Sequence, residues 1–158
     1  MAAQVVLLLT LVLLPSGALW PVPPWMSVVW WALVVIGVVV VVVAGLNLGR
    51  ALTPTPVPNG RAELQTGGLY RWVRHPIYTG VLSIVVGLML SARSWAGLAV
   101  GLTTVVFFHV KARWEEARLV ETFDGYRDYA AATPRFVPLW PAGLVRGTPP
   151  RGPSKGGP

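Results

Sequence analysis

The first charged side chain of this 158-residue chain is Arg50, and within the uncharged stretch before it residues 28–46 carry no polar side chain. A helix of that length crosses a hydrocarbon core of about 30 Å. Over the whole chain 54% of residues are hydrophobic and 12% are charged, about half the charged share of an average soluble domain. A soluble fold cannot hide so much apolar surface. We therefore predict an all-α integral membrane protein, with a single membrane domain over residues 1–145.

Four apolar segments emerge when the chain is divided at its charges. Because a bilayer satisfies backbone polar groups only in helices or closed barrels, even the run of valines at 38–43 is predicted to be helical. The first segment has no basic residue ahead of it, so we interpret it as a retained helix rather than a signal peptide. Residues 91–94 predict a tight turn between the last two, which makes them an antiparallel hairpin. The predicted spans are about 2–20, 25–48, 76–92 and 94–110.

The basic residues predict how these spans are oriented. Of the 13 Lys and Arg residues, Arg93 alone lies outside segments 50–74 and 111–158. Basic residues accumulate on the cytoplasmic side of a membrane. We therefore expect a multi-pass protein of the cell membrane with both termini in the cytoplasm. Topology also explains the net charge of +7, so we do not predict nucleic-acid binding.

A cytoplasmic helix is predicted after the fourth span, over residues 111–131. The Asp124-Gly125 pair should end or bend this helix, and Thr133-Pro134 should stop the short helix that follows the bend. Residues 146–158 are rich in Gly and Pro, which predicts a disordered tail.

The composition excludes several kinds of site. The chain has no cysteine, so it has no disulfide, no thiolate metal site and no cysteine nucleophile. Its two histidines cannot fill a tetrahedral metal site alone, and we predict no metal. No G-x-G-x-x-G loop is present, which argues against a soluble type of nucleotide fold.

Two polar stretches stand out in a chain that otherwise avoids polarity. Residues 67–80 enter the third predicted span, and residues 111–118 leave the fourth. Because the hairpin makes these spans antiparallel neighbours, both stretches should meet at the same cytoplasmic edge. Polar groups against a membrane core are costly and usually functional. The sequence therefore predicts a polar pocket at the membrane edge.

The residues of these stretches suit a ligand with both charges. Pro76 is placed to begin a helix with His75 as its N-cap, where free backbone N–H groups attract anions, and the nearby arginines add charge-assisted contacts. Glu115 and Glu116 point to different helix faces, so one can meet a cationic ligand while the other faces solvent or pairs with Arg113. Aromatic walls would come from the tyrosines and tryptophan nearby, which are Tyr70, Trp72 and Tyr78.

Each of these residues also has an ordinary structural interpretation. The arginines can be cytoplasmic anchors, and His75 can be no more than a helix cap. The tyrosines fit an interfacial aromatic belt, and Lys111 with Glu115 fits a surface pair one helical turn apart.

A resemblance to a known family rests on two motifs in order. Residues 66–80 resemble the T-x-G-x-Y-x-x-x-R-H-P-x-Y-x-G signature of the isoprenylcysteine carboxyl methyltransferase family. The Glu115-Glu116 pair and the later Thr133-Pro134-Arg135-Phe136-Val137-Pro138 segment are similar to the C-terminal half of that family. The resemblance covers about residues 60–138, and the first two predicted spans match in kind alone.

The resemblance implies S-adenosylmethionine as cofactor, bound at the cytoplasmic ends of the last two spans. Lys111 stands where animal relatives have arginine. Because lysine lacks the bidentate fork of arginine, this difference puts the identity of the substrate in doubt. No residue is implied as an acid or base, because an ionised carboxylate acceptor needs positioning rather than proton removal. The implied cofactor-binding residues are Leu64, Gln65, Tyr70, His75, Pro76, Tyr78, Glu115 and Glu116, and the implied substrate-binding residues are Lys111 and Arg113.

The function we expect is methylation of a lipophilic acceptor at the cytoplasmic membrane edge, most like isoprenylcysteine carboxyl O-methylation. The alternatives are a phospholipid N-methyltransferase, a small-thiol S-methyltransferase and a non-catalytic membrane protein. A sterol-type membrane reductase carries a similar R-H-P-x-Y-x-G followed by Asp, whereas Val81 follows Gly80 here. The expected partners are the bilayer and the methyl acceptor, and the oligomeric state is not predicted.

Overall fold

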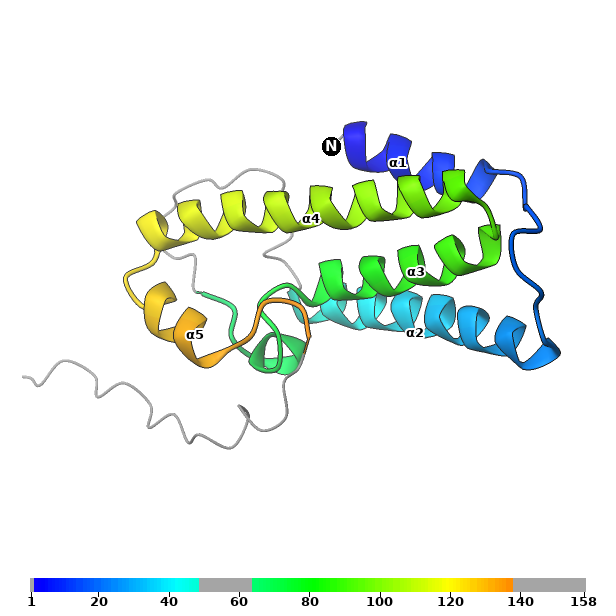
Figure 1. Cartoon of the computed structure of the whole chain (residues 1–158). Helices are drawn as coiled ribbons and strands as arrows, with labels where there is room; N and C mark the ends of the chain where they lie inside the picture. The colour runs from blue at the N-terminus through cyan, green and yellow to red at the C-terminus, as the bar shows by residue number, and fades with distance from the viewer. Residues whose placement is uncertain (1, 49–63, 138–158) are drawn as a thin grey trace, which may run out of the picture.

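A computed structural model describes residues 2–48 and 64–137 of the chain. Within those ranges the chain is all-helical, with α1 beside α4, α4 over α3, and α3 against α2 (Figure 1). The short α5 lies under the C-terminal part of α4, next to a short 3₁₀-helix. The elements are α1 (Ala2–Leu13), α2 (Pro24–Leu48), the 3₁₀-helix η2 (Gly68–Arg71), α3 (Pro76–Ala92), α4 (Trp95–Thr122) and α5 (Tyr126–Ala132).

Helices α2 and α3 approach each other through glycines. A Cβ atom added at Gly37 would lie 2.5 Å from the backbone oxygen of Gly80, and one added at Gly80 would lie 2.6 Å from that of Gly37. At these distances even a Cβ atom would clash with the opposite backbone, so the two helices can come this close only because both positions are glycine. The hydroxyl of Ser83 also donates to the carbonyl of Leu33 on α2.

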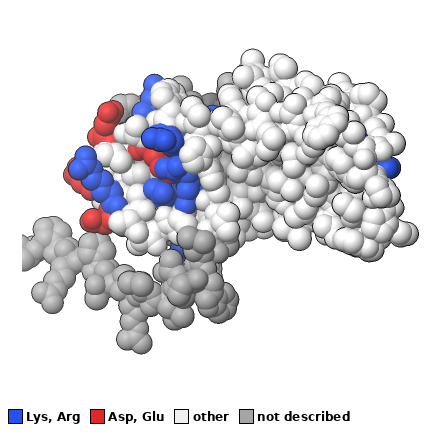
Figure 2. All heavy atoms as spheres, viewed as in Figure 1, with Lys and Arg blue, Asp and Glu red and all other residues white. Residues whose placement is uncertain are grey.

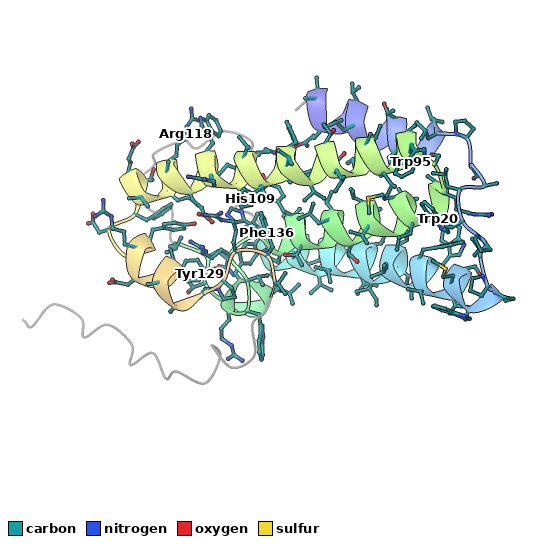
Figure 3. The ribbon with its side chains drawn as sticks, in the orientation of Figure 1. Trp20, Trp95, His109, Arg118, Tyr129 and Phe136 are labelled. Carbon is teal, nitrogen blue, oxygen red and sulfur yellow. The ribbon has the colours of Figure 1, made fainter. Side chains whose placement is uncertain are left out.

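The turn between α3 and α4 is tight and is covered by the α1–α2 connection. Arg93 adopts a left-handed conformation with φ 47°, and Ser94 caps α4 by accepting from the backbone N–H of Gly97. The guanidinium of Arg93 donates to the carbonyl of Trp20 at 2.6 Å, and the N–H of Gly17 donates to a carbonyl at the end of α3. The predicted hairpin with its turn at 91–94 is thus confirmed. Figure 3 shows Trp20 and Trp95 together at this end of the molecule.

Two of the helices, α2 and α4, are long and apolar enough to cross a membrane. Only 11% of the most apolar 18-residue stretch of α2 is buried within the chain, and seven valines of this helix are exposed together with Trp25 and Trp31. Soluble proteins do not expose an apolar surface of that extent, whereas lipid would cover it. Helices α1 and α3 are apolar but shorter, so the structure does not by itself establish the four predicted spans.

Helix boundaries agree with the sequence prediction in α2 and α3 and differ elsewhere. The first helix ends at Leu13 rather than near residue 20, because Pro15 disfavours helical backbone in the residue before it. The predicted cytoplasmic helix 111–131 corresponds to the last part of α4, which runs without a break from the fourth predicted span to Thr122, followed by α5. The predicted break at Gly125 is confirmed, since α5 begins at the next residue. The predicted tail at 146–158 lies outside the described residues.

Candidate functional site

Three segments far apart in the sequence meet at the end of the molecule opposite Arg93. The backbone N–H of Arg74 donates to the carbonyl of Pro134 at 2.9 Å, and that of His75 donates to Arg135 at 3.1 Å. The hydroxyl of Thr79 donates to the carbonyl of Phe136 at 2.7 Å. The segment after α5 is therefore tied along the entrance of α3, which begins at Pro76 with His75 as its N-cap, as predicted.

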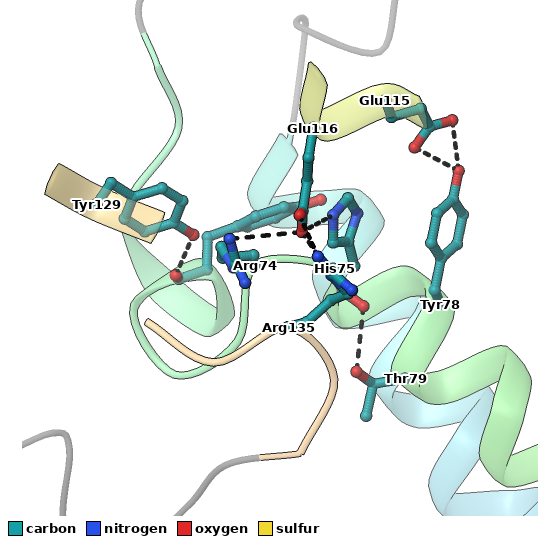
Figure 4. Close-up of polar contacts among 9 residues, drawn as sticks. Arg74, His75, Tyr78, Thr79, Glu115, Glu116, Tyr129 and Arg135 are labelled. Atoms are coloured by element: carbon teal, nitrogen blue, oxygen red, sulfur yellow. Dashed lines mark hydrogen bonds and ion pairs between the residues drawn. The ribbon is translucent and has the colours of Figure 1, made fainter. Parts of the chain in front are cut away.

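The carboxylate of Glu116 lies at the centre of this contact (Figure 4). Arg135 donates to it from two nitrogens, at 2.9 Å to Oε1 and 2.6 Å to Oε2, which is the bidentate fork geometry. His75 Nε2 lies 3.0 Å from Oε1 and a guanidinium nitrogen of Arg74 lies 3.5 Å away. Glu116 is 8% exposed, so its charge is balanced within the protein rather than by water. We call these four side chains the polar junction.

Glu115 points to the other side of α4 and makes a separate set of contacts. Both of its carboxylate oxygens accept from the hydroxyl of Tyr78, at 2.6 and 2.7 Å. The ammonium of Lys111 lies 3.7 Å from Glu115, donates to Gln4 on α1 and sits 5.1 Å from the centre of the Tyr78 ring. The prediction that the two glutamates face different sides is confirmed. The suggested pairing of a glutamate with Arg113 is not found among the described residues.

His75 connects the two glutamate clusters. Its ring is parallel to the ring of Tyr78, with the centroids 5.3 Å apart, and it contacts Glu116 at its Nε2 edge. Burial lowers the pKa of His75 below 6.5, although Glu116 opposes this effect. A neutral imidazole that donates from Nε2 to a carboxylate is therefore the form held near pH 7.

A cavity of about 270 Å³ opens beside His75 and Tyr78, close to the lower end of the size range of small-molecule sites. Four of the residues singled out in the sequence line it, which are Tyr70, His75, Tyr78 and Glu115. Tyr70 is placed there by η2, whose first residue, Gly68, has φ 60° and lies against the side chain of Asn47. The other lining residues are Leu48, Arg74, Ile77 and Leu119.

The remaining predicted site residues do not line this cavity. Pro76 is buried at the start of α3, and Lys111 reaches the cavity wall through Glu115 and Tyr78. Gln65 donates to the carbonyl of Asn47, and Leu64 precedes it. Glu116 and Arg113 instead line a second hollow on the opposite side of the polar junction.

Sequence reasoning gave no role to two residues that hold the site together. Arg135 carries the bidentate contact to Glu116, and the hydroxyl of Tyr129 donates to the carbonyl of Tyr70 at 2.6 Å (Figure 4). The signal for Arg135 was its place in the Thr133–Pro138 motif. Nothing in the spacing linked Tyr129 on α5 to η2. Among the described residues, no group of three His, Asp or Glu side chains lies close enough to hold a metal ion.

Comparison with known proteins adds two findings. A protein-family model described as phospholipid methyltransferase matches residues 25–125, which include α2, η2, α3 and both glutamates. A protein-S-isoprenylcysteine O-methyltransferase of Schizosaccharomyces pombe is 38% identical over 80 residues, which are 49% of this chain. The match spans about a third of the length of that relative, 34%. No solved structure matches the chain.

Proposed function

Because the chain belongs to the phospholipid methyltransferase family, we propose that it is an S-adenosylmethionine-dependent methyltransferase that binds its cofactor in the cavity beside His75 and Tyr78. One observation carries this proposal. Four of the residues that the sequence motifs single out, from η2, α3 and α4, line a single cavity at the polar end of an otherwise apolar helix bundle.

The side chains around the cavity suit the chemistry of this cofactor. S-adenosylmethionine carries a sulfonium cation, an amino-acid zwitterion and an aromatic base. Glu115 supplies a carboxylate for positive charge, Arg74 supplies a guanidinium for a carboxylate, and the Tyr78 ring supplies an aromatic face. The residues present therefore fit the cofactor.

The chain's own contribution would be positioning and exclusion of water. When bound, the cofactor supplies an electrophilic methyl group, whose in-line displacement depends mainly on the alignment of the acceptor. Tyr78 holds Glu115 through its hydroxyl, and Glu116 holds the His75 ring, so both cavity-facing side chains are fixed before a ligand arrives. His75 Nε2 is already committed to Glu116, so we assign His75 a positioning role.

We propose a carboxylate as the methyl acceptor, on a lipophilic molecule. Lys111 lies beside Glu115 and Tyr78 at the edge of the site, where its ammonium is placed to bind an anionic group. An ionised carboxylate needs no base, and the geometry provides none at His75 Nε2. Isoprenylcysteine, the substrate in the name of the S. pombe relative, has such a carboxylate. A phospholipid amine is the second candidate, because the family is named for phospholipid methylation.

The acceptor is identified by incubating membranes that contain the protein with methyl-labelled cofactor. A carboxyl methyl ester releases volatile label as methanol in alkali, whereas N-methyl and S-methyl products retain it. Release of the label into the volatile fraction is the expected result. Alkali-stable label in the phospholipid fraction would establish the second candidate instead. Membranes with no label above those lacking the protein would contradict both.

Cofactor binding is tested separately by calorimetric titration with S-adenosylhomocysteine. Glu115→Gln removes one charge-assisted contact and should weaken binding by about tenfold to more than a hundredfold. Glu121→Gln is the matched control, because this exposed residue lies on the same helix away from the cavity. Equal affinities for the two variants would remove Glu115 from the site.

The role of His75 is tested by steady-state kinetics. His75→Asn should raise KM for S-adenosylmethionine while leaving most of kcat, because positioning residues contribute ground-state binding. Loss of turnover with unchanged cofactor affinity would make His75 a catalytic base, and the acceptor would then be an amine or thiol.

We propose that all four apolar segments, the shorter α1 and α3 included, cross the membrane, with the cavity on the cytoplasmic side. The contacts of Arg93 with Trp20 place the α1–α2 connection at the α3–α4 turn, and the Lys111–Gln4 contact places the start of α1 near the opposite end. Successive connections between the helices then lie at alternate ends of the bundle, as four membrane spans require. Cysteines introduced at Ser16 and Ser94 should react with an impermeant reagent from outside the cell, and cysteines at Ala62 and Ser154 should not. External labelling at Ala62 would reverse the orientation.

A further inference from the structure

A second hollow, of about 500 Å³, lies between α4 and α5. Glu116 lines this hollow and Glu115 lines the cofactor cavity, so the two hollows lie on different faces of α4, and both reach Arg74. We call this second hollow the arginine groove. Its lining consists of Arg74, Arg113, Glu116, Ala117, Val120, Tyr126, Arg127, Ala130, Ala131 and Arg135.

The arginine groove has more positive charge than its single acid can balance. Four arginines line it, and Glu116 is the one acidic residue among the lining residues. Within residues 2–48 and 64–137, neither Arg113 nor Arg127 makes an ion pair or a side-chain hydrogen bond, and both are exposed. Figure 2 shows basic side chains, with acidic ones among them, gathered at the end of the molecule formed by α4 and α5, whereas most of the remaining visible surface is uncharged. The groove therefore attracts anions.

Two buried polar atoms beside the groove lack an acceptor. The hydroxyl of Tyr126, a residue that is 2% exposed, and the Nε of Arg74 have no hydrogen-bond partner of acceptable geometry among the described residues. Both side chains line the groove. Burial raises the pKa of Tyr126, although the Arg74 guanidinium lies close enough to the hydroxyl oxygen to oppose this rise, so the hydroxyl keeps its proton and that proton lacks an acceptor. Arginine Nε donates and never accepts, so an oxygen acceptor from outside would satisfy these buried groups.

The shape of the groove leaves room for that acceptor. Its remaining lining consists of small or short side chains at Ala117, Val120, Ala130 and Ala131, which project little into it. The donors come from α4, α5 and the segments before α3 and after α5. They therefore reach the hollow from four separate segments of the chain, which suits an anion with several acceptor oxygens.

We propose that the arginine groove binds a phosphate group, carried by an anionic phospholipid or by a soluble phosphate ester. Arg113 and Arg127 supply its exposed charge contacts, and Tyr126 with Arg74 supplies buried hydrogen bonds. The proposal does not depend on which methyl acceptor is used, because Arg74 is the one described residue that the groove shares with the lining of the cofactor cavity. Its position at the boundary between apolar helices and charged surface places it where lipid phosphates lie.

The test measures binding by the full chain with two probes. Inorganic phosphate is titrated in detergent against chloride at constant ionic strength. In a second arm, nanodiscs of phosphatidylcholine alone are compared with nanodiscs containing phosphatidylglycerol, and retained lipid is identified by native mass spectrometry. Saturable phosphate binding indicates a soluble source, and selective retention of phosphatidylglycerol indicates a lipid source. Either result supports the proposal. The absence of both phosphate binding and phosphatidylglycerol retention overturns it.

Variants decide whether the binding occurs at the groove. Arg113→Gln and Arg127→Gln should each weaken it by about tenfold or more, since each removes a charge-assisted contact. Both side chains are exposed, so neither change removes a buried contact. Arg118→Gln is the control, because Arg118 stacks on Trp114 and does not line the groove. Equal weakening by all three variants would show non-specific attraction and overturn the proposal, as would no weakening by Arg113→Gln and Arg127→Gln.

Discussion

Along the contact between α2 and α3, the two backbones approach each other at Gly37 and Gly80. The polar side-chain contact described there is the hydrogen bond from the Ser83 hydroxyl to the carbonyl of Leu33. At the polar junction, by contrast, two arginines and a histidine surround the carboxylate of Glu116. Close contact between small residues sets how near two helices lie. Charged hydrogen bonds set which segments meet, because a buried carboxylate without its partners is costly. Close packing of small residues therefore holds α2 against α3, whereas charged hydrogen bonds hold the segments of the polar junction together.

The largest effect we expect comes from removing the charge at the polar junction. Glu116→Gln leaves Arg74 and Arg135 facing each other without a counter-charge, and should lower the free energy of unfolding by about 3 kcal/mol. Thermal unfolding in detergent micelles, followed by tryptophan fluorescence, measures this change. The control is Glu121→Gln, an exposed change on the same helix, expected within about 0.5 kcal/mol of the parent. Similar unfolding of the two variants would mean that charge does not hold the junction.

The helix contact should respond to size instead. Gly37→Leu forces side-chain atoms against the backbone of α3 and should cost about 2 kcal/mol. Gly45→Leu provides the matched control on the same helix, because a Cβ added there meets nothing within 4 Å. If the two leucine variants unfold together, close approach does not stabilise the α2–α3 pair.

Removing one hydroxyl group in each region allows the contribution of a single hydrogen bond to stability to be compared between them. Tyr129→Phe removes a hydrogen bond to the carbonyl of Tyr70 beside the junction, and Ser83→Ala removes one to Leu33 between the helices. Each should cost about 1 kcal/mol, and the double variant should show the sum, since distant sites are additive within about 0.5 kcal/mol. A non-additive double variant would reveal coupling between the helix contact and the site.

The smallest expected effect is a dependence of stability on pH that belongs to the junction alone. Because burial lowers the pKa of His75 below 6.5, the unfolded chain takes up a proton before the folded chain does. This contribution is therefore present above pH 6.5 and is lost as the pH falls through the lower folded pKa. Unfolding temperatures measured across this range should decrease toward acid in Ser83→Ala as in the parent. If His75→Asn shows the same decrease of the unfolding temperature toward acid, the pH dependence belongs to another titrating group.

The sequence predicted the bundle better than the site. The bounds of α2 and α3 follow from uncharged runs that end at Pro and Arg, and their composition admits no other secondary structure in lipid. The early end of α1 was less visible, because Leu13 and its neighbours are apolar on both sides of the break. The helix predicted to leave the membrane at Lys111 is the last part of α4, Trp95–Thr122, because helical backbone tolerates the change from apolar to charged composition at that residue.

The two motifs predicted that residues 67–80 and 111–118 would meet, and the structure confirms this contact. Which glutamate would take which partner could not be predicted, because adjacent residues on a helix differ by a rotation that packing alone sets. The partner of Glu116 is Arg135, whose position depends on how the chain turns back after α5. That path is a tertiary property with no local sequence period.

The backbone hydrogen bonds from Arg74 and His75 to Pro134 and Arg135 also impose an order on biogenesis. During synthesis the helices α2, α3 and α4 can leave the ribosome and pack while the residues that complete the entrance of α3 are still untranslated. The final step is closure of the segment between Glu116 and Arg135, 19 residues apart in the sequence, and the charged contact between them compensates the entropic cost of closing it. A nascent chain arrested before residue 133 would therefore be a bundle without the polar junction, and the junction would be completed only once residues 134 and 135 have been synthesised.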